Sequence, residues 1–260
     1  MKVTAQGISD VGRKREHNED SLLIDGDLGL YVVADGMGGH QGGGTASRLA
    51  VETIRDDVRL ARGRDPGILA GDQAMEESPV RDVLRGAVEK ACRSIFQAAQ
   101  GDPNLQGMGT TVTALLLGGN KAFVAHVGDS RCYLVRQGNI FQVSEDHSLV
   151  NEQLKAGAIT PEEARTSRFR NIITRSVGFE EQVAVDLLGF EVEPGDRLLI
   201  CCDGLSNLVE DHEIRDVVAA APLDQAPQRL VDLANDRGGD DNITVIVLHV
   251  DPEPPAGVGP

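Results

Sequence analysis

The order of the apolar segments constrains the fold of this chain more than any other feature. Strand-like runs come first, two long helix-like segments follow, more strands come next, and further helices precede one closing strand. This order lacks the regular strand–helix alternation that builds a parallel sheet. We therefore expect an α+β fold in which antiparallel sheets are flanked by helices. The predicted strands lie at residues 3–8, 21–24, 30–34, 110–117, 122–127, 132–136, 140–143, 183–190, 197–202 and 243–250.

The predicted helices are marked by apolar periodicity and by residues that favour helix starts. Between residues 78 and 100 apolar side chains recur at i, i+3, i+4 and i+7. Ser78 suits the N-cap of this helix, and Pro79 suits its first helical position. Thr160 opens a shorter helix with a capping-box sequence. The other predictions are helices at 45–59, 211–220 and 226–235, a surface loop at 63–77, and hairpin turns at 25–27, 118–120 and 138–139.

Three of the apolar runs carry an aspartate at one end, namely Asp35, Asp203 and Asp241. A buried strand that ends in aspartate delivers a carboxylate to the rim of its sheet, and carboxylates on neighbouring strands converge. Hard oxygen donors gathered in this way suit Mg²⁺ or Mn²⁺. An Asp-Gly pair also marks a hairpin turn. Two features oppose that interpretation: Gly36 opens a glycine-rich stretch, and Asp203 leads into a helix-like segment.

Several motifs allow a second interpretation. The glycine-rich stretch 36–44 lies between a strand and a helix, as a nucleotide loop does, but it lacks the Gly-Lys-Ser/Thr ending. Residues 25–27 imitate the D-x-D of aspartyl-phosphate phosphatases, although a hairpin turn is the better interpretation. The cluster at 15–20 is either a solvated salt-bridge network or an arginine fork beside metal-organising acids. Gly128-Asp129 taken alone is a turn.

Composition narrows the class of protein. The 260 residues carry a net charge of −16, which argues against nucleic acid or an anionic membrane as a partner. The four cysteines form no C-x-x-C pair, so buried reduced thiols are expected. No apolar run approaches the roughly 20 residues needed to span a membrane. We therefore expect a cytoplasmic protein.

Six motifs, taken together and in this order, resemble those of the metal-dependent protein serine/threonine phosphatases of type 2C, particularly the compact bacterial members. Each motif is weak alone, whereas the six in sequence are specific and cover roughly residues 5–250. They are REHNED at 15–20, VVADGMGGH at 32–40, GTT at 109–111, VGDSR at 127–131, LICCDG at 199–204 and DNIT at 241–244.

The resemblance implies a particular architecture. Two antiparallel sheets would stack face to face between pairs of helices, as a four-layer αββα sandwich. Residues 1–250 would form a single catalytic domain, with a small flap at about 149–171 beside the active site. Residues 251–260, rich in proline and glycine, would be a flexible tail or a truncated linker.

The resemblance also implies a site for two Mn²⁺ or Mg²⁺ ions, with a third, weaker one. Two such cations can bridge a water, lower its pKa, present hydroxide to phosphorus and neutralise phosphoryl charge. Arg15 and the three aspartates named above are the implied catalytic residues. The implied ligands are Asp35, the Gly36 carbonyl, Asp203 and Asp241, with Glu19 and Asp20 acting through metal-bound water, Asp129 with Asp203 at the third site, and Arg15 gripping the phosphoryl group.

Two features near this site leave roles open. Animal members carry His directly after the first Asp-Gly, as general acid, whereas this chain has Met37; nothing in the sequence shows that His40 substitutes. Residues 164–176 contain four arginines and no acid. They are either a solvated basic loop or a strip that attracts acidic sequence around the phosphoresidue. The arginines assigned to substrate binding on the second interpretation are Arg165, Arg168 and Arg170.

The predicted function is hydrolysis of phosphoserine and phosphothreonine on proteins, opposing bacterial-type serine/threonine kinases. The expected partners are phosphorylated proteins, including such a kinase and its substrates, with neither nucleic acid nor membrane. One alternative is a phosphatase of small phosphorylated metabolites that uses the same site. The other is an inactive scaffold, whose expected signature is the loss of a metal-holding aspartate. All three aspartates are present.

Overall fold

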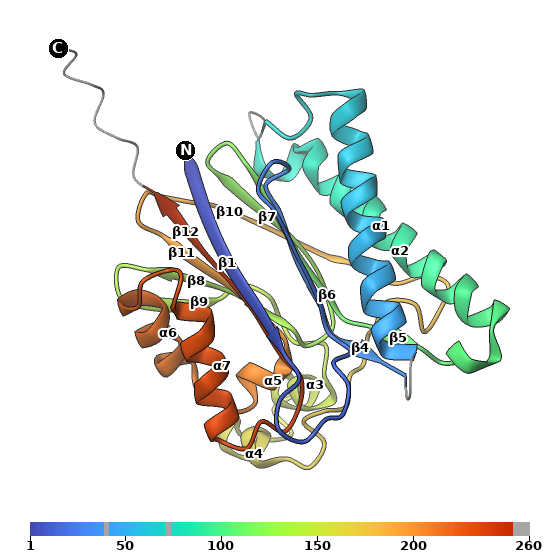
Figure 1. The fold of residues 1–260 in the computed structure, drawn as a ribbon, viewed down its shortest axis with the longest axis vertical. Coiled ribbons are helices and arrows are strands. Elements are labelled where there is room, and N and C mark those ends of the chain that lie inside the picture. The colour runs from blue at the N-terminus through green and yellow to red at the C-terminus, as the bar shows by residue number, and fades with distance from the viewer. Residues whose placement is uncertain (39–41, 71–73, 252–260) are drawn as a thin grey trace.

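The computed structural model describes residues 1–38, 42–70 and 74–251, and its strands form two stacked five-stranded antiparallel sheets (Figure 1). The first sheet has the order β1 (Lys2–Asp10), β12 (Ile243–Asp251), β11 (Arg197–Cys201), β8 (Arg131–Arg136) and β9 (Asn139–Gln142). The second has the order β10 (Asp186–Glu191), β7 (Lys121–Val127), β6 (Val112–Gly118), β3 (Leu30–Ala34) and β2 (Ser21–Asp25). A small pair, β4 (Gly36–Met37) and β5 (Gly109–Thr110), lies beside them.

Helix pairs cover the outer faces of both sheets, so the predicted four-layer sandwich is confirmed (Figure 1). The pair α1 (Gly42–Arg64) and α2 (Pro79–Gly101) packs on the sheet that contains β3, β6 and β7. The pair α6 (Asp211–Ala220) and α7 (Ala226–Asp236) packs on the sheet that contains β11 and β12. The short helices are α3 (Leu149–Lys155), α4 (Pro161–Thr166), α5 (Asp203–Ser206), η1 (Met75–Glu77) and η2 (Pro103–Leu105).

Side-chain alternation explains why the strand runs are apolar throughout. In β11, Leu199 faces the α6–α7 layer, whereas Leu198 and Ile200 face the space between the two sheets. Successive side chains of a strand point to opposite faces, and here both faces are covered. Strands buried on both sides therefore read as continuous hydrophobic runs even though the sheets are antiparallel.

The structure corrects three of the predicted boundaries. The single strand predicted at 110–117 is interrupted at Thr111, which turns aside to bind the main chain of Asp35. The strand predicted from residue 183 begins only at Asp186. The predicted loop 63–77 includes the last two residues of α1 and the 3₁₀ helix η1, and its residues 71–73 lie outside the described part.

The predicted turns are confirmed where the structure describes them. Strands β2 and β3 pair around residues 25–27, at the opposite end of β2 from Asp20, so the D-x-D interpretation is excluded. Strands β6 and β7, and β8 and β9, also pair as hairpins. Thr160 and Glu163 form the predicted capping box of α4. Ser78 and Pro79 stand at the N-cap and the first position of α2, but the Ser78 side chain makes no capping hydrogen bond. Among the described helices, none is both long and apolar enough to cross a membrane.

Candidate metal centre

Strand pairing brings the predicted aspartates to one end of the sandwich. Asp20 directly precedes β2 and Asp35 directly follows β3, and these strands pair so that Ser21 lies opposite Ala34. Asp203 begins α5 just beyond β11, and Asp241 lies just before β12, which pairs with β11. The carboxylates thus come from both sheets. A cleft of about 400 Å³ is lined by Arg15, Glu16, His17, Glu19, Asp35, Gly36, Met37, Gly38, Asp129, Asn171, Ile173, Asp203, Asp241 and Asn242.

The main chain of Asp35 is held by the two threonines of the GTT motif. The Thr111 N–H donates to the Asp35 carbonyl at 2.8 Å, and the Asp35 N–H donates to Thr111 Oγ1 at 3.0 Å. Thr110 Oγ1 donates to the same carbonyl at 2.9 Å. These bonds fix the backbone of Asp35, which explains why β5 and β6 separate here.

Asn242 clamps the N-terminal loop to the start of β12. Its Nδ2 donates to the carbonyls of Val11 and His17 at 2.9 and 3.0 Å, and its Oδ1 accepts the Glu19 N–H at 2.8 Å. Its own N–H donates to Asp241 Oδ1 at 2.8 Å. Sequence reasoning gave this residue no role, although its place beside Asp241 in the DNIT motif was a signal.

Gly36 is required by close approach of the backbone. A Cβ at this position would lie 2.1 Å from the Gly43 carbonyl oxygen and 2.5 Å from that of Glu19. Any side chain would therefore push apart the start of α1 and the loop that carries Glu19. This packing places the residue directly beside Asp35, on the wall of the cleft.

The buried carboxylates of this cluster lack enough neighbouring positive charge to balance their negative charge. Burial, together with neighbouring carboxylates, raises the pKa of Asp35 and Asp129 well above the ordinary value and also raises that of Asp203. Burial raises the pKa of Asp20 to about 7. Within the described part of the chain, four buried carboxylate oxygens accept no hydrogen bond: Glu19 Oε1, Asp20 Oδ1, Asp129 Oδ1 and Asp203 Oδ1.

Unpartnered buried carboxylates are costly unless a cation or a donor satisfies them. The unpartnered donors of the cluster are carboxylate oxygens, which are ligands that Mg²⁺ and Mn²⁺ take. The residues present therefore fit hard divalent cations.

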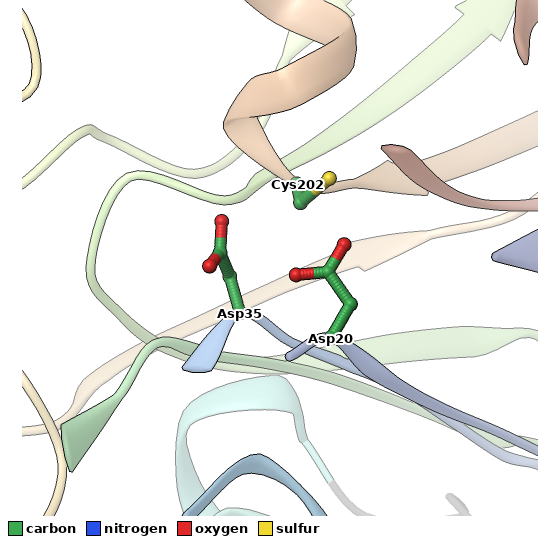
Figure 2. A group of neighbouring side chains, drawn as sticks. All are labelled: Asp20, Asp35 and Cys202. Carbon is green, nitrogen blue, oxygen red and sulfur yellow. The ribbon is translucent and has the colours of Figure 1, made fainter. Parts of the chain in front are cut away.

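One further donor faces this cluster, and it is a sulfur. Ligand atoms of Asp20, Asp35 and Cys202 all lie within 4.8 Å of one another (Figure 2). Sequence reasoning predicted Cys202 only as a buried reduced thiol, which it is. Its place one residue before Asp203 was the available signal for a second role.

The loop that carries Asp129 is held by His147, which sequence reasoning also missed. The ring atom His147 Nδ1 accepts the Gly128 N–H at 3.0 Å, and the main-chain N–H of His147 donates to the Gly128 carbonyl at 2.8 Å. Because Nδ1 is the acceptor, Nε2 carries the proton, and it donates to Asp186 Oδ2 at 3.0 Å. Gly128 has φ +113°, a conformation that favours glycine. The loop at 128–130 is not a hairpin turn, because it joins β7 in one sheet to β8 in the other.

Comparison with known proteins decides the family. The protein phosphatase 2C family model matches residues 12–243. The chain belongs to the protein phosphatase 2C family. It is 39% identical over 251 residues to protein phosphatase PhpP of Streptococcus pneumoniae, covering 95% of this chain and 97% of that protein.

Solved structures agree with this assignment. The Mycobacterium tuberculosis serine/threonine phosphatase PstP/Ppp superposes with a TM-score of 0.85 at 34% identity, covering 96% of this chain and 99% of that one. The PstP catalytic domain in complex with two manganese ions superposes with a TM-score of 0.82 at 34% identity, with coverages of 96% and 99%.

Arg15 lies at the rim of the cleft in this 2C-family chain. Its Nη2 donates to Asp241 Oδ2 at 2.7 Å, and about half of its side chain is exposed. The guanidinium is thus a partly exposed salt-bridge partner of Asp241 at the mouth of the cleft, and its role as a phosphate fork stays a prediction.

A larger cleft of about 990 Å³ adjoins the first and shares Asp129 and Asp203 with it. It runs between helices α3 and α4 on one side and the segment from α5 to α6 on the other. Arg165 and Arg170 line this cleft, and Arg165 pairs with Glu210 at the start of α6. Arg168 is not among the lining residues and lies over the Phe169 ring, 4.7 Å from its centroid. His40, the other residue left open, lies outside the described residues.

Proposed function

We propose that this chain is a metal-dependent phosphatase that hydrolyses phosphoserine and phosphothreonine on proteins. The observation that carries the proposal is the convergence of buried carboxylates whose oxygens lack partners at one end of the sandwich. Family membership and relatives named serine/threonine phosphatases support the reaction and the class of substrate.

Asp35, the Gly36 carbonyl, Asp203 and Asp241 would hold two Mn²⁺ or Mg²⁺ ions. Asp129 with Asp203 would hold a third, and Glu19 and Asp20 would act through water. The two manganese ions of PstP and the unpartnered oxygens of this chain support this assignment. When bound, such ions activate water for attack on phosphorus and neutralise phosphoryl charge.

The remaining groups of the chain orient the substrate. Arg15 would donate to phosphoryl oxygens at the mouth of the cleft, since its planar guanidinium matches an oxyanion with two parallel N–H groups. It would then share its donors between the phosphoryl group and Asp241, its present partner. Asn242 keeps the loop that carries Arg15 in place through its bonds to Val11 and His17.

The larger cleft favours a polypeptide substrate over a small metabolite. It extends from Asp129 and Asp203 along α3 and α4 to the start of α6, and its volume of about 990 Å³ lies at the upper end of the range for small-molecule sites. A phosphoprotein segment lying in it would meet Arg170, which lines the cleft, and the Arg165–Glu210 pair that joins the flap to α6.

We also infer that residues 1–250 act as one catalytic unit, that the flap lies at about 149–171, and that the enzyme opposes a serine/threonine kinase in the cytoplasm. The two sheets share the core between them, which supports a single unit. All four cysteines are free and buried, which fits a reducing compartment.

The deciding experiment measures phosphate release from phosphoserine and phosphothreonine peptides and from small phosphoesters, with Mn²⁺ and with excess chelator. We expect release from the peptides that requires the metal and is abolished in Asp241→Ala. The matched control is Asp232→Asn, an exposed aspartate on α7. Full activity in chelator, or hydrolysis of small phosphoesters alone, would overturn the proposal.

A further inference from the structure

The sulfur of Cys202 gives one side of the carboxylate cluster a donor that a hard cation does not need. We propose that Asp20, Asp35 and Cys202 form a binding site for a softer divalent cation, of the class of Zn²⁺, Cd²⁺ or Co²⁺. Thiolate ligands select such ions, whereas Mg²⁺ and Mn²⁺ are satisfied by oxygen. The site goes beyond the proposed function and does not depend on it.

Three separate elements build the site. Asp20 comes from the residue before β2, Asp35 from the end of β3, and Cys202 from the junction of β11 and α5. One ligand atom of each lies within 4.8 Å of the others. Figure 2 shows both carboxyl groups projecting toward Cys202, which approaches from the other sheet. Bonds of about 2.0–2.3 Å from a tetrahedral ion to oxygen and sulfur would draw these ligand atoms to about 3.3–3.5 Å from one another.

The surroundings of the sulfur support a metal bond. The Thr244 N–H donates to Cys202 Sγ at 3.0 Å, an arrangement that stabilises negative charge on sulfur. On Asp20, Oδ2 accepts the Thr244 hydroxyl at 2.6 Å, while Oδ1 is buried and accepts no hydrogen bond from the described residues. The Asp20 carboxylate is therefore held in place through Oδ2, while Oδ1 is available to bind a cation.

The chemistry of binding is a replacement of a proton. In the metal-free protein the Cys202 thiol carries its proton and donates it to the Asn242 carbonyl at 3.3 Å. Binding breaks the S–H bond, forms the metal–sulfur bond, and releases the proton to solvent. Because Asp35 belongs to both sites, a softer cation here competes with Mn²⁺ at the carboxylate centre.

The neighbouring cysteine offers a matched control. Cys201 is equally buried, but it points to the opposite face of β11 and packs in the core under α6 and α7. Cys202 belongs to the core between the sheets. Replacing either thiol with a hydroxyl changes the same kind of buried side chain, and only one of the two replacements removes the proposed ligand.

The test uses the full chain, stripped of metal with chelator and then titrated with Cd²⁺ or Co²⁺ without substrate. We expect a sulfur-to-metal charge-transfer band in the near ultraviolet that saturates at one equivalent, with proton release. Cys202→Ser should abolish the band and weaken Cd²⁺ binding by about tenfold or more, with Mn²⁺ affinity changed by less than about threefold. Cys201→Ser should keep the band, and added Mn²⁺ should raise the apparent Kd for Cd²⁺.

Absence of the band, or its survival in Cys202→Ser, would overturn the proposal. If that variant does not fold, X-ray absorption of the Zn²⁺-loaded unmodified protein decides, because one sulfur at about 2.3 Å is expected. A shell of oxygen and nitrogen alone would then overturn it. These measurements involve no phosphoester, so their failure would leave the proposed function untouched, and failure of that function would leave this site standing.

Discussion

Neutralising Asp20 should change how the stability of the metal-free protein depends on pH. Burial, with smaller contributions from Asp203 and Asp241, raises the pKa of the Asp20 carboxyl from 3.8 to about 7. The folded protein therefore retains a proton that the unfolded chain releases between these two values. The free energy of unfolding must fall as the pH rises through this window, because the folded state binds more protons there.

The size of the effect follows from the width of the window. A pKa about three units higher in the folded state corresponds to about 4 kcal/mol of lost stability above pH 7. By the same linkage, about 3 kcal/mol of this loss falls between pH 5 and pH 8. The variant Asp20→Asn keeps the shape of the side chain and an acceptor for the Thr244 hydroxyl, but it cannot ionise.

Urea unfolding in chelator, followed by circular dichroism at pH 5 and pH 8, measures the difference. Between these pH values the free energy of unfolding of the unmodified protein should fall by about 3 kcal/mol more than that of Asp20→Asn. At pH 8 the unmodified protein should be the less stable of the two in chelator and the more stable of the two in Mn²⁺. Asp232→Asn, on the exposed face of α7, should follow the unmodified protein. Parallel curves for the unmodified protein and Asp20→Asn would refute the reasoning.

Three further predictions concern the groups around the centre. Arg15→Ala should raise KM for a phosphopeptide at least as much as it lowers kcat, because the guanidinium binds substrate and transition state alike; unchanged kinetics and unchanged phosphate inhibition would make it a surface salt-bridge partner. Arg170→Gln should lower kcat/KM for an acidic phosphopeptide at low salt and spare an aryl phosphate, whereas Arg168→Gln, which lies outside the cleft, should change neither; equal effects of the two variants would contradict steering. His147→Ala removes the acceptor of the Gly128 N–H, so calorimetry should find the weakest Mn²⁺ site lost and the two tighter ones kept; three intact sites would show that the loop holds itself.

The carboxylate centre could be predicted from the sequence because its signals are local. An aspartate directly after or before a buried apolar run indicates both the type of ligand and its position at the edge of a sheet. Asp35, Asp203 and Asp241 do lie at one end of the sandwich, as that argument requires. The four layers could be predicted from the order of elements, since strands buried on both faces must be covered on both faces.

The parts that escaped prediction depend on contacts distant in sequence. Thr111 leaves the strand because it binds Asp35, 76 residues earlier. Gly128 looked like part of a turn because the residue that fixes it, His147, comes 19 residues later. Periodicity reports which face of a strand is buried, but it does not report which main-chain group a side chain binds. The arginines between residues 164 and 176 show the same limit, since charge pattern alone does not separate Arg168 from Arg170.

The features of this centre that favour cation binding destabilise the protein when no metal is bound. The same burial that raises the pKa of Asp35 and Asp129 makes their charged forms costly in the metal-free protein. A cation that binds only the folded state recovers that cost, and it stabilises the fold by an amount that grows with its concentration. Because protons compete for the same oxygens, the stabilisation by metal must be largest where the metal-free protein is weakest, above the raised pKa values. Divalent cations should therefore raise the free energy of unfolding of this protein as well as support its chemistry.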